Sequence, residues 1–143
     1  MTTIWFVQPN LERLNALSAN CMPGHLGIEF TEIGEDHLRA RMPVDQRTTQ
    51  PFGLLHGGAS VALAETMGSV GATLCIDPAH KICVGLEINA NHVRAVRSGF
   101  VHGTARPIHL GNSTHVWDIR IHDDHGHLVC VARLTMAVLD QKG

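Results

Sequence analysis

The sequence predicts a single α+β domain in which one central helix packs against a long antiparallel sheet. The helix is expected at about 57–76, a segment rich in Ala, Val, Leu and Met without period-two alternation and long enough for about five turns. After it, apolar residues recur at every second position, which is typical of strands that bury one face. In a chain of 143 residues, one apolar helix and one long sheet form a single layered domain spanning 1–143.

Ahead of the central helix, the pattern predicts one amphipathic helix and two short strands. Leucines at positions 11, 14 and 17 follow Pro9 and Asn10, as expected for one face of a helix. Further on, apolar residues at every second position alternate with Arg or His. The expected elements are a helix over 9–19, a strand over 25–30, a turn over 34–36 and a strand over 37–42.

Beyond the central helix, the alternation predicts four strands. A hairpin turn is expected at 123–126, where the sequence reads Asp-Asp-His-Gly. Ser60, or the pair Gly57 and Gly58, is expected to cap the start of the central helix. The four strands are expected over 82–91, 99–107, 113–122 and 127–139.

Composition excludes several classes of protein. The net charge of −2 argues against a nucleic-acid binder held by a basic face. The chain has no apolar run of about 18 residues, the length needed to span a membrane, and no signal-peptide pattern at its start. The four cysteines form no C-x-x-C pair, so we expect reduced thiols in a cytoplasmic protein.

Eleven histidines and the absence of tyrosine are the unusual features of the composition. Candidate metal ligands gather between 122 and 127, where three histidines and two aspartates stand close together. This cluster straddles a predicted turn, where polar residues are expected anyway, and we therefore predict no metal site.

Glu65 is the one formally charged residue between Arg47 and Asp77. It lies midway along the most apolar helix, where a buried, unpaired carboxylate would be costly. A glutamate in such a place is either paired or poised for chemistry. The alternative is a carboxylate at the solvent-facing edge of the helix, or one that Thr66 or Ser69 caps.

The loop before the central helix predicts a site for developing negative charge. It runs from Thr48 through Gly and Pro residues to the helix start, where unpaired N–H groups and the helix dipole favour an oxyanion. Gly57 lets a ligand approach the backbone closely, while Gln50 offers an amide donor and His56 an imidazole. The alternative is a capping loop that holds a hydrogen-bonded histidine.

These segments resemble the hotdog-fold acyl-CoA thioesterases of the 4-hydroxybenzoyl-CoA thioesterase type, which use a glutamate on the helix. The resemblance runs from about Leu11 to Leu139 and implies the hotdog fold, a long antiparallel sheet wrapped around one central helix. The matching segments are MPVD at 42–45, QPFGLLHGGAS at 50–60, ETMGS at 65–69, GLEINANHVR at 85–94 and HLG at 109–111.

The resemblance implies a role for each matching position. Glu65 corresponds to the nucleophile or general base, Gly57 to the N–H that polarises the thioester carbonyl, and Ser69 to the hydroxyl one turn past the glutamate. Gln50 and His56 correspond to side chains that position the carbonyl or the attacking water. The expected contacts to coenzyme A are His92, Arg94, Ser113 and Thr114.

The implied reaction is hydrolysis of acyl-CoA to a free acid and coenzyme A. The expected acyl groups are aromatic or hydroxyaryl, such as 1,4-dihydroxy-2-naphthoyl, which would place the enzyme in menaquinone biosynthesis. The alternatives are a broad-range or proofreading thioesterase acting on acyl-CoA or acyl-carrier-protein thioesters, a hotdog dehydratase or hydratase, and a non-catalytic acyl-CoA binding protein. No cofactor is expected, because coenzyme A is part of the substrate, and no nucleic-acid or membrane partner.

The spacing of Gly57 and Glu65 predicts a site shared between two subunits. Eight residues of helix correspond to about 12 Å of rise, too far for one carbonyl to contact both groups of the same chain. A glutamate side chain leans toward the helix N-terminus but recovers only part of that distance. We therefore expect at least a homodimer, and the resemblance extends this to a tetramer made of two dimers.

Overall fold

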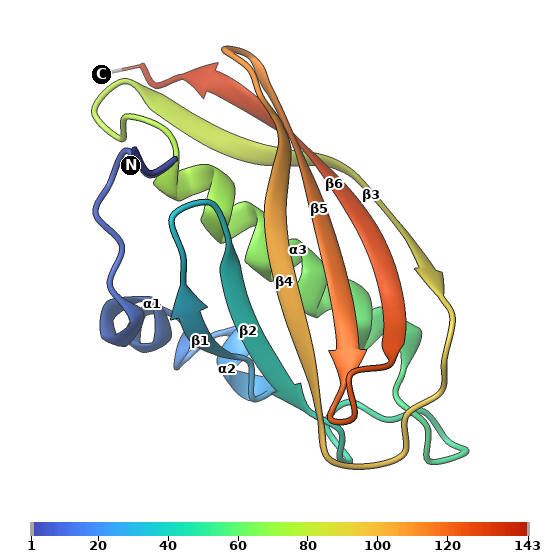
Figure 1. Cartoon of the computed structure of the whole chain (residues 1–143). Helices are drawn as coiled ribbons and strands as arrows, with labels where there is room; N and C mark the ends of the chain where they lie inside the picture. The colour runs from blue at the N-terminus through green and yellow to red at the C-terminus, as the bar shows by residue number, and fades with distance from the viewer. Residues whose placement is uncertain (1, 143) are drawn as a thin grey trace.

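The computed structural model describes residues 2–142 as one curved sheet with a long helix across its inner face (Figure 1). The helices are α1 (Leu11–Ser18), α2 (Met22–His25) and α3 (Gly57–Leu74). The strands are β1 (Glu29–Ile33), β2 (Leu38–Pro43), β3 (Lys81–His92), β4 (Phe100–Leu110), β5 (Thr114–Asp123) and β6 (Leu128–Asp140).

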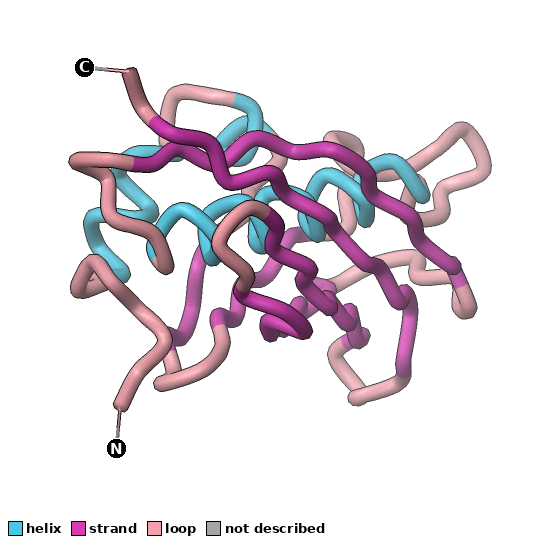
Figure 2. Tube along the Cα trace, turned by 90° about the horizontal axis from the view of Figure 1, so that it is seen from above, coloured by secondary structure: helices cyan, strands magenta, loops and turns pink. Residues whose placement is uncertain are grey.

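The six strands form one antiparallel sheet in the order β1-β2-β4-β5-β6-β3. The sheet curls around α3, so that helix and sheet form two layers when the molecule is seen from above (Figure 2). The predicted α+β hotdog architecture is confirmed, with the central helix ending at Leu74 rather than at residue 76.

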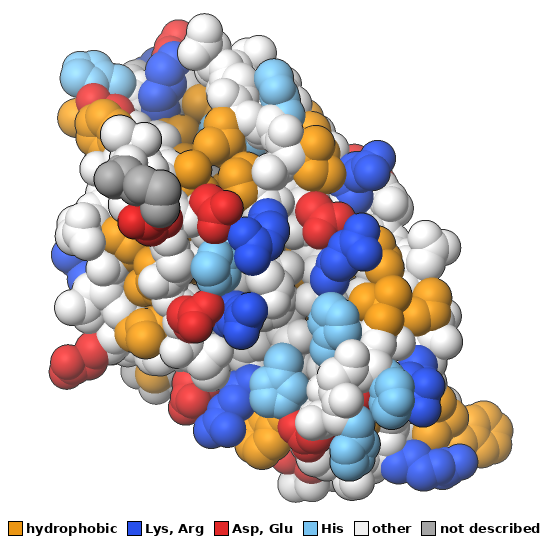
Figure 3. All heavy atoms as spheres, in the orientation of Figure 1, with side chains coloured by type: hydrophobic (Ala, Val, Ile, Leu, Met, Phe, Trp, Pro, Cys, Tyr) orange, Lys and Arg blue, Asp and Glu red, His pale blue; other side chains and the backbone are white. Residues whose placement is uncertain are grey.

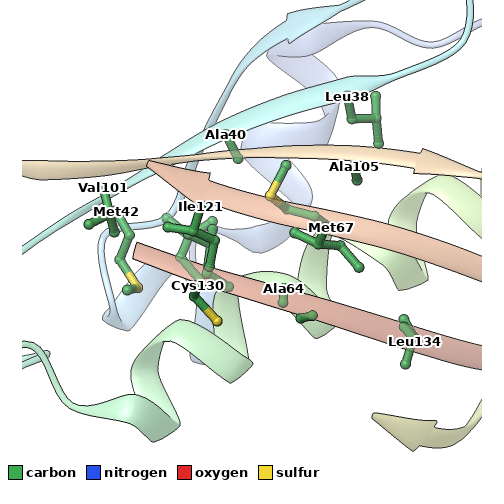
Figure 4. Close-up of a cluster of buried hydrophobic side chains, with 14 of the residues drawn as sticks. Leu38, Ala40, Met42, Ala64, Met67, Val101, Ala105, Ile121, Cys130 and Leu134 are labelled. Atoms are coloured by element: carbon green, nitrogen blue, oxygen red, sulfur yellow. The ribbon is translucent and has the colours of Figure 1, made fainter. Parts of the chain in front are cut away.

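The core lies between α3 and the inner face of the sheet, where Ala64 and Met67 of α3 pack among apolar side chains of the strands (Figure 4). Glycine lets the helix approach the sheet closely: a Cβ atom at Gly71 would lie 2.7 Å from the Trp117 ring. Because Trp117 is fully buried, a side chain at position 71 would force the helix away from the sheet.

The expected strand over 25–30 is wrong over residues 25–28. Residues Met22–His25 form the short helix α2, and the strand begins only at Glu29. Pro23 lies in the first turn of α2, where the missing N–H of proline costs nothing and its fixed φ favours the helix. Gly27, with φ 76°, reverses the chain after α2.

Strand β3 does not keep one face toward the core along its whole length. Its pairing with β6 shifts between Gly85 and Glu87, a β-bulge that leaves one extra residue in β3. Before the bulge Cys83 packs against the core, and after it Ile88 does. Ile82, Val84 and Leu86 are therefore left exposed on an edge strand.

The outer face of the sheet is polar. Lysine, arginine, acidic and histidine side chains cover the strands on this side (Figure 3). Several of them form ion pairs across the strands, as Arg41 of β2 does with Glu29 of β1 at 3.3 Å. Within residues 2–142, no helix combines the length and apolar content that a membrane span requires.

Candidate active site

A pocket of about 430 Å³ opens at the start of α3, next to the end of β3. It collects residues that are far apart in the sequence, because the loop before α3 and the segment after β3 meet there. Four predicted site residues line it: Gln50, Gly57, His92 and Arg94. Leu54, Leu55, Val93 and Val129 form apolar parts of its wall.

His56 caps α3, so the prediction of a cap by Ser60 or the glycine pair is wrong. Its Nδ1 accepts a hydrogen bond of 2.7 Å from the Gly58 N–H, while Ser60 is buried inside the first turn. Since Nδ1 is the acceptor, the proton of the neutral ring lies on Nε2, which is free to donate. The imidazole therefore both caps the helix and presents a donor at the helix start.

The N–H of Gly57 is the first of the helix and bonds to no acceptor among residues 2–142. It lines the pocket, where the helix dipole adds a partial positive charge. The side chain of Gln50 is fixed nearby, because its Oε1 accepts a hydrogen bond from the Phe52 N–H. This bond leaves the amide NH₂ of Gln50 as a second donor.

His92 ends β3, Arg94 lies in the segment after it, and both line the pocket beside the helix start. The Nε2 of His92 lies 2.9 Å from the position that a Cβ atom of residue 57 would occupy, so only glycine fits there without displacing the ring. The Nε of Arg94 lies 3.6 Å from the carboxylate of Asp123. Burial favours a raised pKa for Asp123, but hydrogen bonds from His127 and His125 outweigh it and keep the pKa below the usual value.

Glu65 lies in a different place, midway along α3 and half-buried beneath the β3 bulge. A Cβ atom at Gly85 would lie 3.0 Å from its Oε2. No hydrogen bond or ion pair within residues 2–142 engages its carboxylate, so neither Thr66 nor Ser69 caps it. Ser69, one turn further, bonds instead to the sulfur of Met136 at 3.7 Å.

Glu65 lines a small groove of about 170 Å³ between α2 and α3, whereas Gly57 lines the larger pocket. One chain therefore presents the helix-start donors and the carboxylate in two separate recesses. Ser113 ends the β4–β5 turn and Thr114 begins β5, and both are far from these recesses, near the other end of α3 (Figure 1). Within one chain, the structure does not bring them to Arg94.

The histidine and aspartate cluster near the β5–β6 turn is engaged in pairs. His102 bonds to Asp124 at 2.7 Å, and His127 bonds to Asp123 at 3.3 Å. Over residues 2–142, no group of three or more His, Cys, Asp or Glu side chains is arranged to hold a metal ion. Asp123 instead fixes the turn and faces Arg94.

The sequence patterns did not identify two residues that shape the site, Gly85 and Asp123. Gly85 had a signal, because a glycine inside a strand often marks a bulge or a close approach. Asp123 had none, since its proximity to Arg94 depends on how the turn between β5 and β6 meets the loop after β3.

The sheet wrapped around α3, the donors at the helix start and the carboxylate on the helix define a hotdog-fold enzyme. The family model described as the thioesterase superfamily matches residues 52–130. The chain belongs to this family and is a thioester hydrolase.

Relatives and solved structures match this chain over nearly its whole length. The 1,4-dihydroxy-2-naphthoyl-CoA hydrolase of Escherichia coli K12 is 56% identical over 136 residues, covering 95% of this chain and 99% of that protein. The proofreading thioesterase EntH of Cronobacter turicensis is 51% identical, covering 95% and 98%. The crystal structure of a mutant of thioesterase PA1618 from Pseudomonas aeruginosa has a TM-score of 0.96 at 55% identity, covering 97% of this chain and 100% of that chain.

Proposed function

We propose that this enzyme hydrolyses aromatic or hydroxyaryl acyl-CoA thioesters, with 1,4-dihydroxy-2-naphthoyl-CoA as the foremost candidate and menaquinone biosynthesis as its pathway. The observation that carries the chemistry is the free N–H of Gly57 at the start of α3, in one pocket with Arg94. The similarity to the E. coli hydrolase supports 1,4-dihydroxy-2-naphthoyl as the acyl group. The four free cysteines support the cytoplasm as its compartment.

In this proposal, the thioester carbonyl accepts hydrogen bonds from the Gly57 N–H and from the free donors of Gln50 and His56. Negative charge that develops on the carbonyl oxygen is stabilised there by the helix dipole. Glu65 either attacks the carbonyl carbon to form an anhydride or removes a proton from the attacking water. Arg94 and His92 hold the coenzyme A portion, since a guanidinium binds phosphate through paired hydrogen bonds.

We propose that two subunits share each site. The long strand β3 is an edge of the sheet and exposes Ile82, Val84 and Leu86, an apolar row suited to a second copy. Pairing of the two edges about a two-fold axis would bring Gly57 of one subunit to the partner subunit's Glu65. The tetramer expected from the family resemblance would then join two such dimers.

The shared site is tested by mixing two inactive variants, Glu65→Ala and Gly57→Pro. Proline suits the first helical position and the extended ψ of 131° at His56, removes the N–H, and adds a Cβ atom that displaces the His92 ring, so this variant loses the donor side of its own site. Co-refolded mixtures should regain about a quarter of wild-type activity, because half of the dimers are hybrids and each hybrid has one intact site. Activity no higher than that of the separate variants would contradict a shared site.

The chemistry is tested by single-turnover hydrolysis of benzoyl-CoA by Glu65→Gln, which keeps the size of the side chain. We expect the single-turnover rate constant to fall by about 10³-fold with the Kd for substrate nearly unchanged. In the wild-type enzyme, label from H₂¹⁸O that appears in Glu65 after one turnover supports the anhydride, because direct attack by water on the thioester places label only in the free acid. Turnover of Glu65→Gln near the wild-type rate would contradict the assignment.

A proofreading role is the second candidate, because EntH of Cronobacter turicensis is 51% identical to this chain. A panel of naphthoyl, benzoyl, short-chain and long-chain thioesters, each on coenzyme A and on acyl carrier protein, separates the two. A kcat/KM at least about tenfold higher for naphthoyl-CoA favours the first candidate, and equal values across carriers favour proofreading. No turnover of any thioester would support a binding protein instead.

A further inference from the structure

The groove between α2 and α3 has an apolar lining to which the proposed reaction assigns no role. Four of its six lining residues are apolar: Met22, Pro23, Leu26 and Ala62. The remaining two are Glu65 and Thr66. In the proposed reaction, Glu65 acts at the carbonyl carbon of the thioester. A recess with an apolar wall beside this carboxylate therefore suits an apolar acyl group bonded to that carbon.

Local contacts fix the position of α2, which forms one wall of the groove. The N–H of Ile28 bonds to the carbonyl of Pro23 at 2.9 Å, and the buried Ile28 side chain anchors the end of α2 in the core. Along α3, residues 62, 65 and 66 follow the spacing of one helix face, so the apolar wall and the carboxylate face the same space.

We propose that this groove is the acyl site and that Met22, Leu26 and Ala62 determine which acyl groups are hydrolysed, a proposal that rests on the thioesterase reaction at Glu65. Its volume of about 170 Å³ is close to that of cavities that hold one benzene ring, about 150 Å³. The groove therefore accepts the ring attached to the carbonyl. A second fused ring extends over Met22, whose side chain is 62% exposed at the rim.

The larger pocket does not compete for this role. Arg94, His92 and the helix-start donors lie there beside an apolar wall that includes Leu54 and Val93, a mixture that suits the charged phosphates and the apolar stretches of the coenzyme A portion. The phosphates and amides of that portion would lose hydrogen bonds in the apolar groove, so each part of the substrate has one suitable recess.

Kinetics of Ala62→Leu with acetyl-CoA, benzoyl-CoA and 2-naphthoyl-CoA test the proposal. Leucine keeps helix propensity and fills the groove. We expect kcat/KM for both aromatic substrates to fall by at least about tenfold, with acetyl-CoA changed less than about twofold. Met22→Ala should alter only the naphthoyl value. Val61→Leu is the control, because Val61 is half-buried on α3 but does not line the groove.

An equal loss for acetyl and aromatic substrates, or no loss at all, would overturn the acyl site while leaving the thioesterase reaction intact. Failure of the reaction itself is distinguishable, because the wild-type enzyme would then hydrolyse none of the three substrates. Inhibition by free coenzyme A, which lacks an acyl group, should be the same in wild type and Ala62→Leu.

Discussion

Gly85 of β3 lies directly against Glu65 of α3: a Cβ atom at position 85 would stand 3.0 Å from the Glu65 Oε2. The β3 bulge and the glycine together leave just enough room for the carboxylate between strand and helix. The position of this carboxylate is therefore set by the edge strand as well as by its own helix.

The first prediction is that Gly85→Ala lowers kcat by about tenfold or more with little change in KM, because the added methyl displaces the carboxylate by a fraction of an ångström. In a Glu65→Asp background the shorter side chain avoids the methyl, so Gly85→Ala should have little further effect. Steady-state kinetics of the wild type, Gly85→Ala, Glu65→Asp and the double variant measure the coupling between the two positions. Additive losses would show that Gly85 acts elsewhere.

The second prediction concerns the exposed edge of β3. Leu86→Arg places a charge in the apolar row and should shift the protein to a monomer in sedimentation experiments, with activity reduced by about 100-fold or more because each site is incomplete. Ile108→Arg is the matched control, since Ile108 is similarly exposed but lies on β4. A monomeric Leu86→Arg variant with normal turnover would refute the shared site.

The third prediction separates binding from chemistry. Arg94→Ala should raise KM for acyl-CoA by about tenfold with kcat changed less than about twofold, the cost of losing charged hydrogen bonds to phosphate. Arg94→Lys should recover part of the loss, because lysine keeps the charge without the paired donors. Arg133→Ala, on the outer face of β6, should leave both constants unchanged. A fall in kcat alone would place Arg94 in the chemical step.

The fourth prediction concerns pH and stability. His115 is 3% exposed, its Nδ1 has no hydrogen-bond partner among residues 2–142, and burial, with a smaller contribution from His109, lowers its pKa. As the pH falls below about 6.5, the His115 imidazole therefore takes up a proton in the unfolded state before it does so in the folded state. Stability from this group is complete above about pH 6.5 and is lost as the pH falls toward the lowered folded value.

Urea unfolding of wild type and His115→Leu between pH 8 and pH 5 measures this effect. The free energy of unfolding should fall more steeply in the wild type, by at most about 1.4 kcal/mol per pH unit for one proton. His25→Leu serves as the control, because His25 is exposed and its ring forms no hydrogen bond or ion pair within residues 2–142. Parallel pH profiles for wild type and His115→Leu would contradict the prediction.

Sequence patterns predicted the elements whose signals are local. The apolar run of α3, the alternating strands and the turn at 123–126 each follow from residues that are neighbours in the chain. Glu65 was identifiable for the same reason, since a single charge inside an apolar helix stands out without any knowledge of its surroundings. The short helix α2 was missed because four residues carry too little periodicity to distinguish it from a strand.

By itself, the sequence determined the sheet around α3, the donors at its start and the carboxylate eight residues later. Only the tertiary structure decided that His56 is the helix cap, that Asp123 faces Arg94 and that the bulge at Gly85 turns an apolar row outward. It also decided that Gly57 and Glu65 open into separate recesses. The reason is physical: periodicity fixes which residues share a face, whereas packing between distant segments fixes what each face meets.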